Sequence, residues 1–158
     1  MDRPDRPIVD WLQGRASLGA ASGWTTEEIR LVADLAYWLA EQGRYQEAIT
    51  IFEGLAALAP ATAYFQSALG ALWLRNGQPE RALPYLEATL AADPQDFTAL
   101  INRGEAHLLL GDLDGARRDL EAVLDLSEKL PQTPLLQMCI TRARALLHTA
   151  LAKDLVKK

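Results

Sequence analysis

Apolar residues between Thr26 and Lys129 gather into six segments of helical length, each with polar residues on its remaining positions. The first two segments, TEEIRLVADLAYWLAEQ and RYQEAITIFEGLAAL, are separated by Gly43. Such a pattern predicts amphipathic helices that bury one face against their neighbours. The expected helices span residues 26–42, 44–58, 61–75, 79–91, 95–110 and 112–129.

Glycine marks the break inside each helix pair. Gly43, Gly77 and Gly111 recur at intervals of 34 residues, just past the expected end of a helix. A left-handed backbone conformation is common at this position, and glycine adopts it without a side-chain clash. We therefore expect three helix-turn-helix units of equal length, each with a tight turn at its glycine.

Small and large residues recur in the same register. Small residues allow two helix backbones to approach closely, and we expect this at Ala36, Gly70 and Gly104 and on the returning helices at Ala48, Ala82 and Ala116. The neighbouring large residues are expected to fill the space that the small ones leave. They are Leu35, Leu69, Leu39, Trp73, Phe52, Leu86 and Leu120.

Helix starts are marked by capping residues. Thr25 is followed three residues later by Glu28, which predicts a capping box at the start of the first helix. Trp24 and Ile29 are placed to form the hydrophobic staple of the same helix. Pro79 fits the first position of the fourth helix, where a missing backbone N–H costs nothing.

The N-terminal 25 residues precede the repeating pattern. Residues 1–6 are expected to be a mobile tail, and residues 21–24 a linker. Between them, residues 8–20 predict a short amphipathic helix with two alternative roles: it caps the first unit or it forms a homodimer. Its apolar positions, and thus its candidate dimerisation residues, are Ile8, Trp11, Leu12 and Leu18.

The third unit and the C-terminus depart from the pattern. Arg103 and His107 replace the apolar residues of the earlier units, either as polar groups at the edge of the core or as contacts to a ligand. After Pro134, a last helix lacks the repeating positions and is expected to cap the array. Its expected buried face consists of Leu135, Met138, Cys139, Leu146, Leu147, Ala150 and Leu151.

Composition narrows the function. The chain has 158 residues, a net charge of −5 and one cysteine, Cys139. An acidic chain is a poor ligand for nucleic acid, and one cysteine cannot form an internal disulfide. Without a membrane-length apolar run or a signal peptide, we expect a cytoplasmic protein. Because no catalytic or metal-ligand spacing occurs, we expect no enzyme activity, metal or cofactor.

The first helix of each pair is expected to line a concave groove that binds a protein or peptide. The expected lining combines two tyrosines, small residues that leave pockets, and scattered polar groups. The candidate groove residues are Arg30, Ala33, Asp34, Tyr37, Tyr64, Ser67, Ala71, Leu74, Ile101, Asn102 and Glu105.

Residues 26–129 resemble the tetratricopeptide repeat family, which implies an all-α superhelix of three helix-turn-helix repeats with an N-terminal helix and a C-terminal capping helix. The expected divisions are residues 1–25, three repeats (26–60, 61–94 and 95–130) and residues 131–158. The whole layout resembles the class II chaperones of type III secretion systems. The shared features are WLQG at residues 11–14, the frame from Ala36 to Phe52, and Leu55, Leu58, Tyr64 and Phe65.

This second resemblance implies a groove that holds a proline- and leucine-containing segment of a secreted translocator, and a dimer formed by the N-terminal helix. A scaffold that bridges larger proteins is the alternative function. A clamp for a C-terminal carboxylate is disfavoured because Asp34, Ala68 and Thr98 replace the asparagines and lysine that it needs, and an aspartate there repels the carboxylate.

Overall fold

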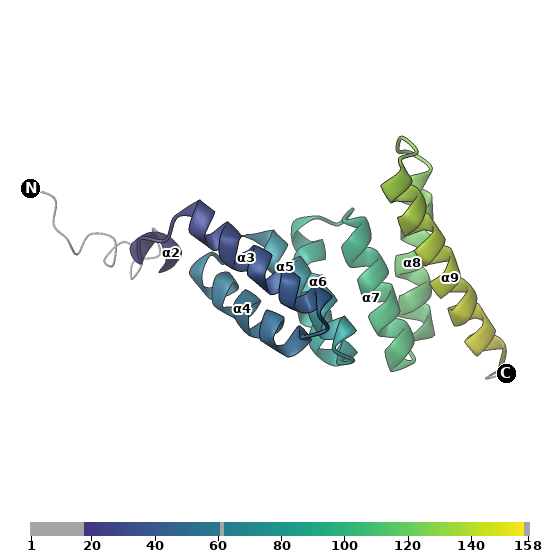
Figure 1. Cartoon of the computed structure of the whole chain (residues 1–158). Coiled ribbons are helices and arrows are strands. Elements are labelled where there is room, and N and C mark those ends of the chain that lie inside the picture. The colour runs from purple at the N-terminus through teal and green to yellow at the C-terminus, as the bar shows by residue number, and fades with distance from the viewer. Residues whose placement is uncertain (1–17, 61, 157–158) are drawn as a thin grey trace, which may run out of the picture.

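The computed structural model describes residues 18–60 and 62–156, and every regular element in these ranges is an α-helix. The candidate dimerisation residues Ile8, Trp11 and Leu12 lie outside the described residues. The helices follow each other in a single row, with α2 at one end and α9 at the other (Figure 1). They are α2 (Leu18–Ala21), α3 (Thr26–Glu41), α4 (Tyr45–Leu58), α5 (Ala63–Arg75), α6 (Pro79–Ala92), α7 (Phe97–Leu110), α8 (Leu113–Ser127) and α9 (Pro134–Val156).

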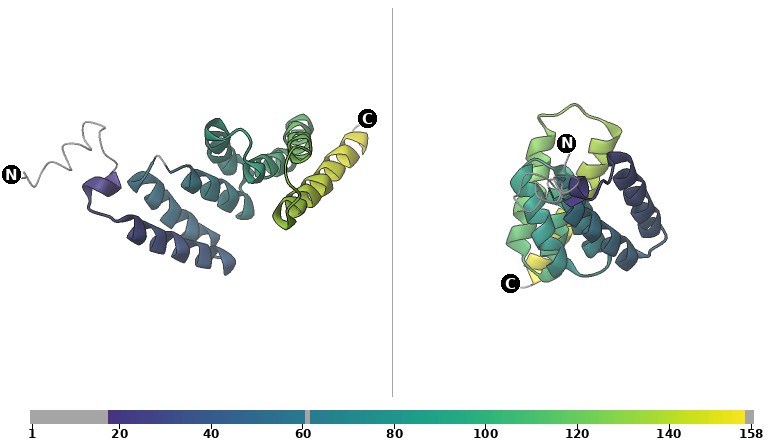
Figure 2. Two further views of the ribbon diagram at one scale, coloured as in Figure 1. Left: turned by 90° about the horizontal axis from the view of Figure 1, so that it is seen from above. Right: turned by 90° about the vertical axis from the view of Figure 1, so that its left-hand side faces the viewer.

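From α3 onward each helix packs against the next, and α2 packs against α4. Contacts join α5 to α7 and α7 to α9, in addition to those between sequential neighbours. Helix directions turn along the row when it is viewed from above or from its N-terminal end (Figure 2). This arrangement confirms the expected all-α superhelix. No helix in the described ranges is long and apolar enough to cross a membrane.

The turns and caps follow the sequence signals. Gly43, Gly77 and Gly111 have φ values of +75°, +74° and +82°, which confirms the left-handed conformation expected at each. The Glu28 N–H donates to Thr25 Oγ1 at 3.2 Å, and the Thr25 N–H donates to Glu28 Oε2 at 2.8 Å. These two bonds form the expected capping box.

Close helix approach occurs where the small residues recur. A Cβ atom on Gly70 would lie 2.7 Å from Leu86 Cγ, and one on Gly104 would lie 2.9 Å from Leu120 Cγ. Leu86 and Leu120 are fully buried, so neither has free space to move into. The two glycines therefore set how closely α5 approaches α6 and α7 approaches α8.

Arg103 and His107 each contact a carboxylate within the chain. The Arg103 guanidinium donates two hydrogen bonds to the Asp119 carboxylate, at 2.8 and 2.7 Å, and thereby joins α7 to α8. This bond to Asp119 raises the pKa of the Arg103 guanidinium. His107 Nδ1 lies 2.9 Å from Asp112 Oδ2. Both side chains act inside the fold, in agreement with the structural alternative for these residues.

Two expectations about packing are wrong. Leu35 is half exposed. In the second unit, the second helix of the preceding unit packs against the first helix, as α4 does against α5, but the described ranges contain no such helix before α3. On α9, Leu135 and Met138 are exposed and Leu151 is partly exposed, whereas Cys139, Leu146, Leu147 and Ala150 pack against the core as expected. The buried positions of α9 are one residue further along the chain at its start, and comprise Leu136, Ile140, Ala143 and Ala150.

We predict that Gly70→Ala destabilises the fold relative to Gly54→Ala. Gly54 lies in α4 with open space around its Cα, so alanine there should raise the free energy of unfolding by about 0.5–1 kcal/mol through its higher helix propensity. Gly70→Ala must displace the buried Leu86, and should be about 1–3 kcal/mol less stable than Gly54→Ala. Urea unfolding followed by circular dichroism measures both. Equal stabilisation by the two alanines would contradict the close contact.

We also predict that Asp119→Ala lowers the free energy of unfolding by about 2 kcal/mol, because it leaves the partly buried Arg103 without its hydrogen-bond partner. Asp34→Ala is the matched control, since Asp34 pairs with Arg30 at 3.7 Å on the exposed surface. That change should cost less than about 1 kcal/mol. The same denaturation measurement compares the two, and a similar cost for both would show that the Arg103–Asp119 pair contributes no more than a surface pair.

Candidate functional site: a row of hollows across the first helices

An aromatic cluster lies at the junction of α3, α4 and α5. The rings of Tyr37 and Phe52 meet edge to face with centroids 5.3 Å apart, and Tyr64 lies 6.0 Å from Tyr37. Phe65 packs against Phe52 at 6.1 Å. Phe52 and Phe65 are buried, whereas both tyrosines keep part of their rings exposed. The two buried phenylalanine rings therefore hold the two tyrosine rings in place at the surface.

Tyr37 remains protonated over the physiological range. Partial burial is the main cause that raises the pKa of its hydroxyl, and the neighbouring Tyr64 raises it further. A neutral hydroxyl both donates and accepts hydrogen bonds. The Tyr37 edge of the cluster can thus pair with a peptide N–H or C=O without a change of charge.

Two hollows flank Tyr64. The first has a volume of about 640 Å³ and lies between α2, α3 and the start of α5; Ile29, Ala33 and Phe65 form part of its wall. The second, about 310 Å³, lies between α3, α5 and the start of α7. Tyr64 lines both, so its ring forms the ridge between them. Small side chains, among them Ala33 and Ala71, leave the space.

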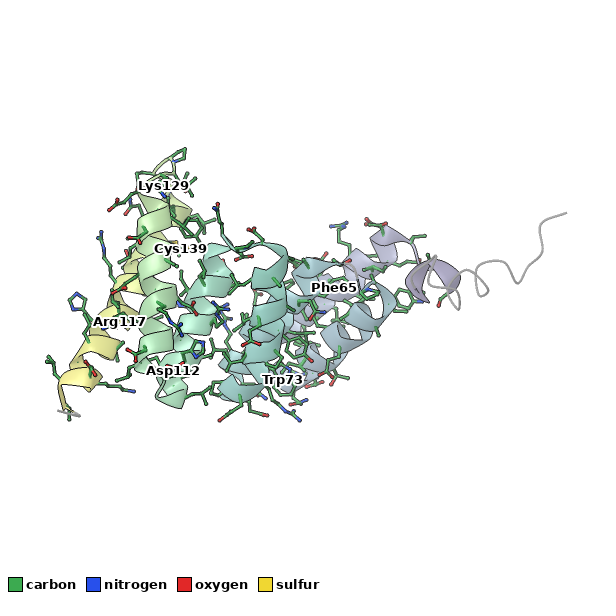
Figure 3. The ribbon with its side chains drawn as sticks, turned by 180° about the vertical axis from the view of Figure 1, so that it is seen from behind. Phe65, Trp73, Asp112, Arg117, Lys129 and Cys139 are labelled. Carbon is green, nitrogen blue, oxygen red and sulfur yellow. The ribbon has the colours of Figure 1, made fainter. Side chains whose placement is uncertain are left out.

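A third hollow, about 450 Å³, continues the row at the start of α7 and α9. Thr98 lines both the second and the third hollow, as Tyr64 lines the first and second. Leu130, Leu135 and Cys139 form part of its wall. In Figure 3, Phe65 of the first hollow and Cys139 of the third lie well apart along the row of helices.

Most of the expected groove residues of the first two units line these hollows. Arg30, Ala33 and Asp34 line the first, Tyr64 lines the first and second, and Tyr37, Ser67 and Ala71 line the second. Their role in peptide binding stays a prediction. Leu18 is the first residue of α2.

The expected groove residues further along the array do not line these three hollows. Leu74, Ile101 and Asn102 are only 7%, 1% and 4% exposed, so they belong to the interior. Ile101 occupies the position of Ala33 and Ser67, but its larger side chain fills the space that they leave open, and α9 packs across α7. Glu105 is ion-paired with Arg142 of α9.

Sequence reasoning missed the third hollow. Its wall includes residues of the connection between α8 and α9 and of the first turns of α9, none of which follows the repeating pattern. No signal in the sequence marked this hollow, because Leu135 follows the pattern of a buried helix face and only the structure shows it exposed.

The chain was compared with protein-family models, with curated proteins and with solved structures. A tetratricopeptide repeat family model matches residues 33–83 and 68–131. No curated protein matches the sequence. Many solved structures are similar.

Three of these structures illustrate the likeness. PcrH of Pseudomonas aeruginosa, in complex with the chaperone-binding region of PopD, is 26% identical with a TM-score of 0.74, over 84% of this chain and 97% of PcrH. A type III secretion complex from Aeromonas hydrophila gives 25% identity and a TM-score of 0.79, over 94% and 97%. The chaperone SycD of Yersinia enterocolitica, with a peptide of the translocator YopD, shares the fold at 22% identity and a TM-score of 0.71, over 82% and 97%.

Proposed function

Because this chain belongs to the tetratricopeptide repeat family, whose stacked helix pairs present an extended surface, we propose that its row of hollows holds an extended apolar segment of a partner protein. The observation that carries this proposal is the continuity of the hollows, which Tyr64 and Thr98 join on one side of the array. Side chains of the partner enter the hollows, and its backbone lies across the ridges between them.

The partner is a translocator of a type III secretion system, and the chain is its cytoplasmic chaperone. Support comes from PcrH, which is 26% identical and has been solved with the chaperone-binding regions of PopD and of PopB. A translocator carries apolar segments that would aggregate before export, and a groove that covers one of them keeps the protein soluble. This role needs no catalytic group, metal or cofactor.

Recognition in the first two hollows rests on shape and on hydrogen bonds. Arg30 and Asp34 at the first hollow pair with each other at 3.7 Å, and Arg30 also pairs with Glu27 at 2.6 Å. These charges are largely balanced within the chain. The ligand side chains suited to this environment are leucine, proline and other uncharged apolar residues, with the Ser67 and Tyr37 hydroxyls available to the ligand backbone.

A scaffold that binds through its outer surface is the second candidate. One observation favours it: Leu31, Leu35 and Trp38 form an exposed apolar stripe on α3, and none of the three lines the hollows described above. Such a stripe suits a second protein or another copy of this chain. A homodimer through the N-terminal segment, with Ile8, Trp11, Leu12 and Leu18, belongs to the same class of association.

We predict that Tyr64→Ala weakens the complex with a translocator by about 1–3 kcal/mol, because it removes the ridge between two hollows. The chain is co-expressed with a type III secretion translocator from the same genome, the complex is purified, and the dissociation constant is measured by calorimetry. Trp38→Ala is the matched control, an exposed aromatic on a different face of the array.

The two candidate functions give opposite results in this experiment. A groove chaperone loses affinity with Tyr64→Ala and keeps it with Trp38→Ala. A scaffold that binds through the α3 stripe shows the reverse. If the secreted protein stays insoluble on co-expression with the wild-type chain, the chaperone function is refuted.

A further inference from the structure

We infer that the third hollow is an additional binding site, which takes an apolar, non-acidic side chain from the same extended segment that occupies the first two hollows. This inference rests on the proposed function. It assigns a binding role to the start of α9 and to Leu135, which lie beyond the repeats and outside the expected groove.

Continuity is the first reason. Thr98, at the start of α7, belongs to the walls of both the second and the third hollow. A chain that leaves the second hollow across Thr98 therefore enters the third directly. With about 8–10 Å between packed helices, the path from α5 through α7 to α9 is roughly 20 Å. About six residues of extended chain cover this distance.

The chemistry of the wall defines the ligand. Phe97, Leu130, Leu135 and Leu136 supply apolar surface, and Asp96 is the one charged residue among those that line the hollow. The Asp96 carboxylate accepts a hydrogen bond from the Ala99 N–H at 2.8 Å and so caps α7. An acidic ligand group would be repelled by this carboxylate and would find no cation in the wall, whereas an aliphatic side chain would bury apolar surface.

Leu135 lies in the wall of this hollow and is 71% exposed, which leaves its side chain available to a partner.

Leu135 and Met138 provide a matched pair of variants. Met138 is 70% exposed on the same helix but is not part of the wall of the hollow. Both side chains can be changed to serine without loss of core packing, and circular dichroism verifies the fold. Any difference between the two variants in ligand binding therefore reports on the hollow itself.

The probes are peptides selected on the full-length chain from a random 20-residue phage-display library, resynthesised and titrated by fluorescence anisotropy. We expect Leu135→Ser to weaken binding about tenfold, and Met138→Ser to change it less than about twofold. Shortening the peptide at the end that reaches α9 should remove the sensitivity to Leu135→Ser. Protection of the Cys139 thiol from a maleimide by bound peptide gives a second, independent readout.

Three results would overturn the inference, and they differ in what they imply for the proposed function. If Tyr64→Ala weakens binding and Leu135→Ser does not, the groove ends at the second hollow and the chaperone function stands. If no peptide is selected, or if neither variant matters, both proposals fail. If Leu135→Ser instead changes the mass of the free protein in light scattering from dimer to monomer, the third hollow is an interface between two copies.

Discussion

The close approach of α5 to α6 and of α7 to α8 is the constraint on which the rest of the structure depends. Leu86 and Leu120 occupy the space where a side chain on Gly70 or Gly104 would lie. Helix pairs that approach this closely stack at a repeating angle, and a repeating angle curves the array. The hollows exist because the first helices of successive units lie side by side on one side of that curve, with small residues such as Ala33 and Ala71 between them.

Much of this architecture could be predicted from the sequence, because it depends on local chemistry that repeats. A glycine past a helix end, a threonine three residues before a glutamate, and a proline at a helix start each have one dominant local structure. Gly43, Gly77 and Gly111 all have positive φ, and Pro79 begins α6 as expected. The glycine recurs three times in register, and together these signals locate the helix ends to within about two residues.

The groove was harder to predict, because an equivalent position in a repeat does not guarantee an equivalent environment. Ala33, Ser67 and Ile101 are equivalent in sequence, but only the first two leave space for a ligand. The third unit differs because α9 packs across α7, and because Ile101 is large enough to fill its own site. Whether a position opens to the groove depends on the neighbouring helix, and in a one-dimensional array the two ends have unlike neighbours.

The same asymmetry explains how one array can present chemically distinct sites. Charged groups along the array pair with one another, as Arg103 does with Asp119 and Arg142 with Glu105. These ion pairs hold helices together and leave little net charge for a ligand to recognise. Selectivity then has to come from the size and shape of the hollows. The first hollow has about twice the volume of the second, and residues of α9 form part of the wall of the third. A helix that caps the array against solvent thereby becomes part of the surface that selects the partner.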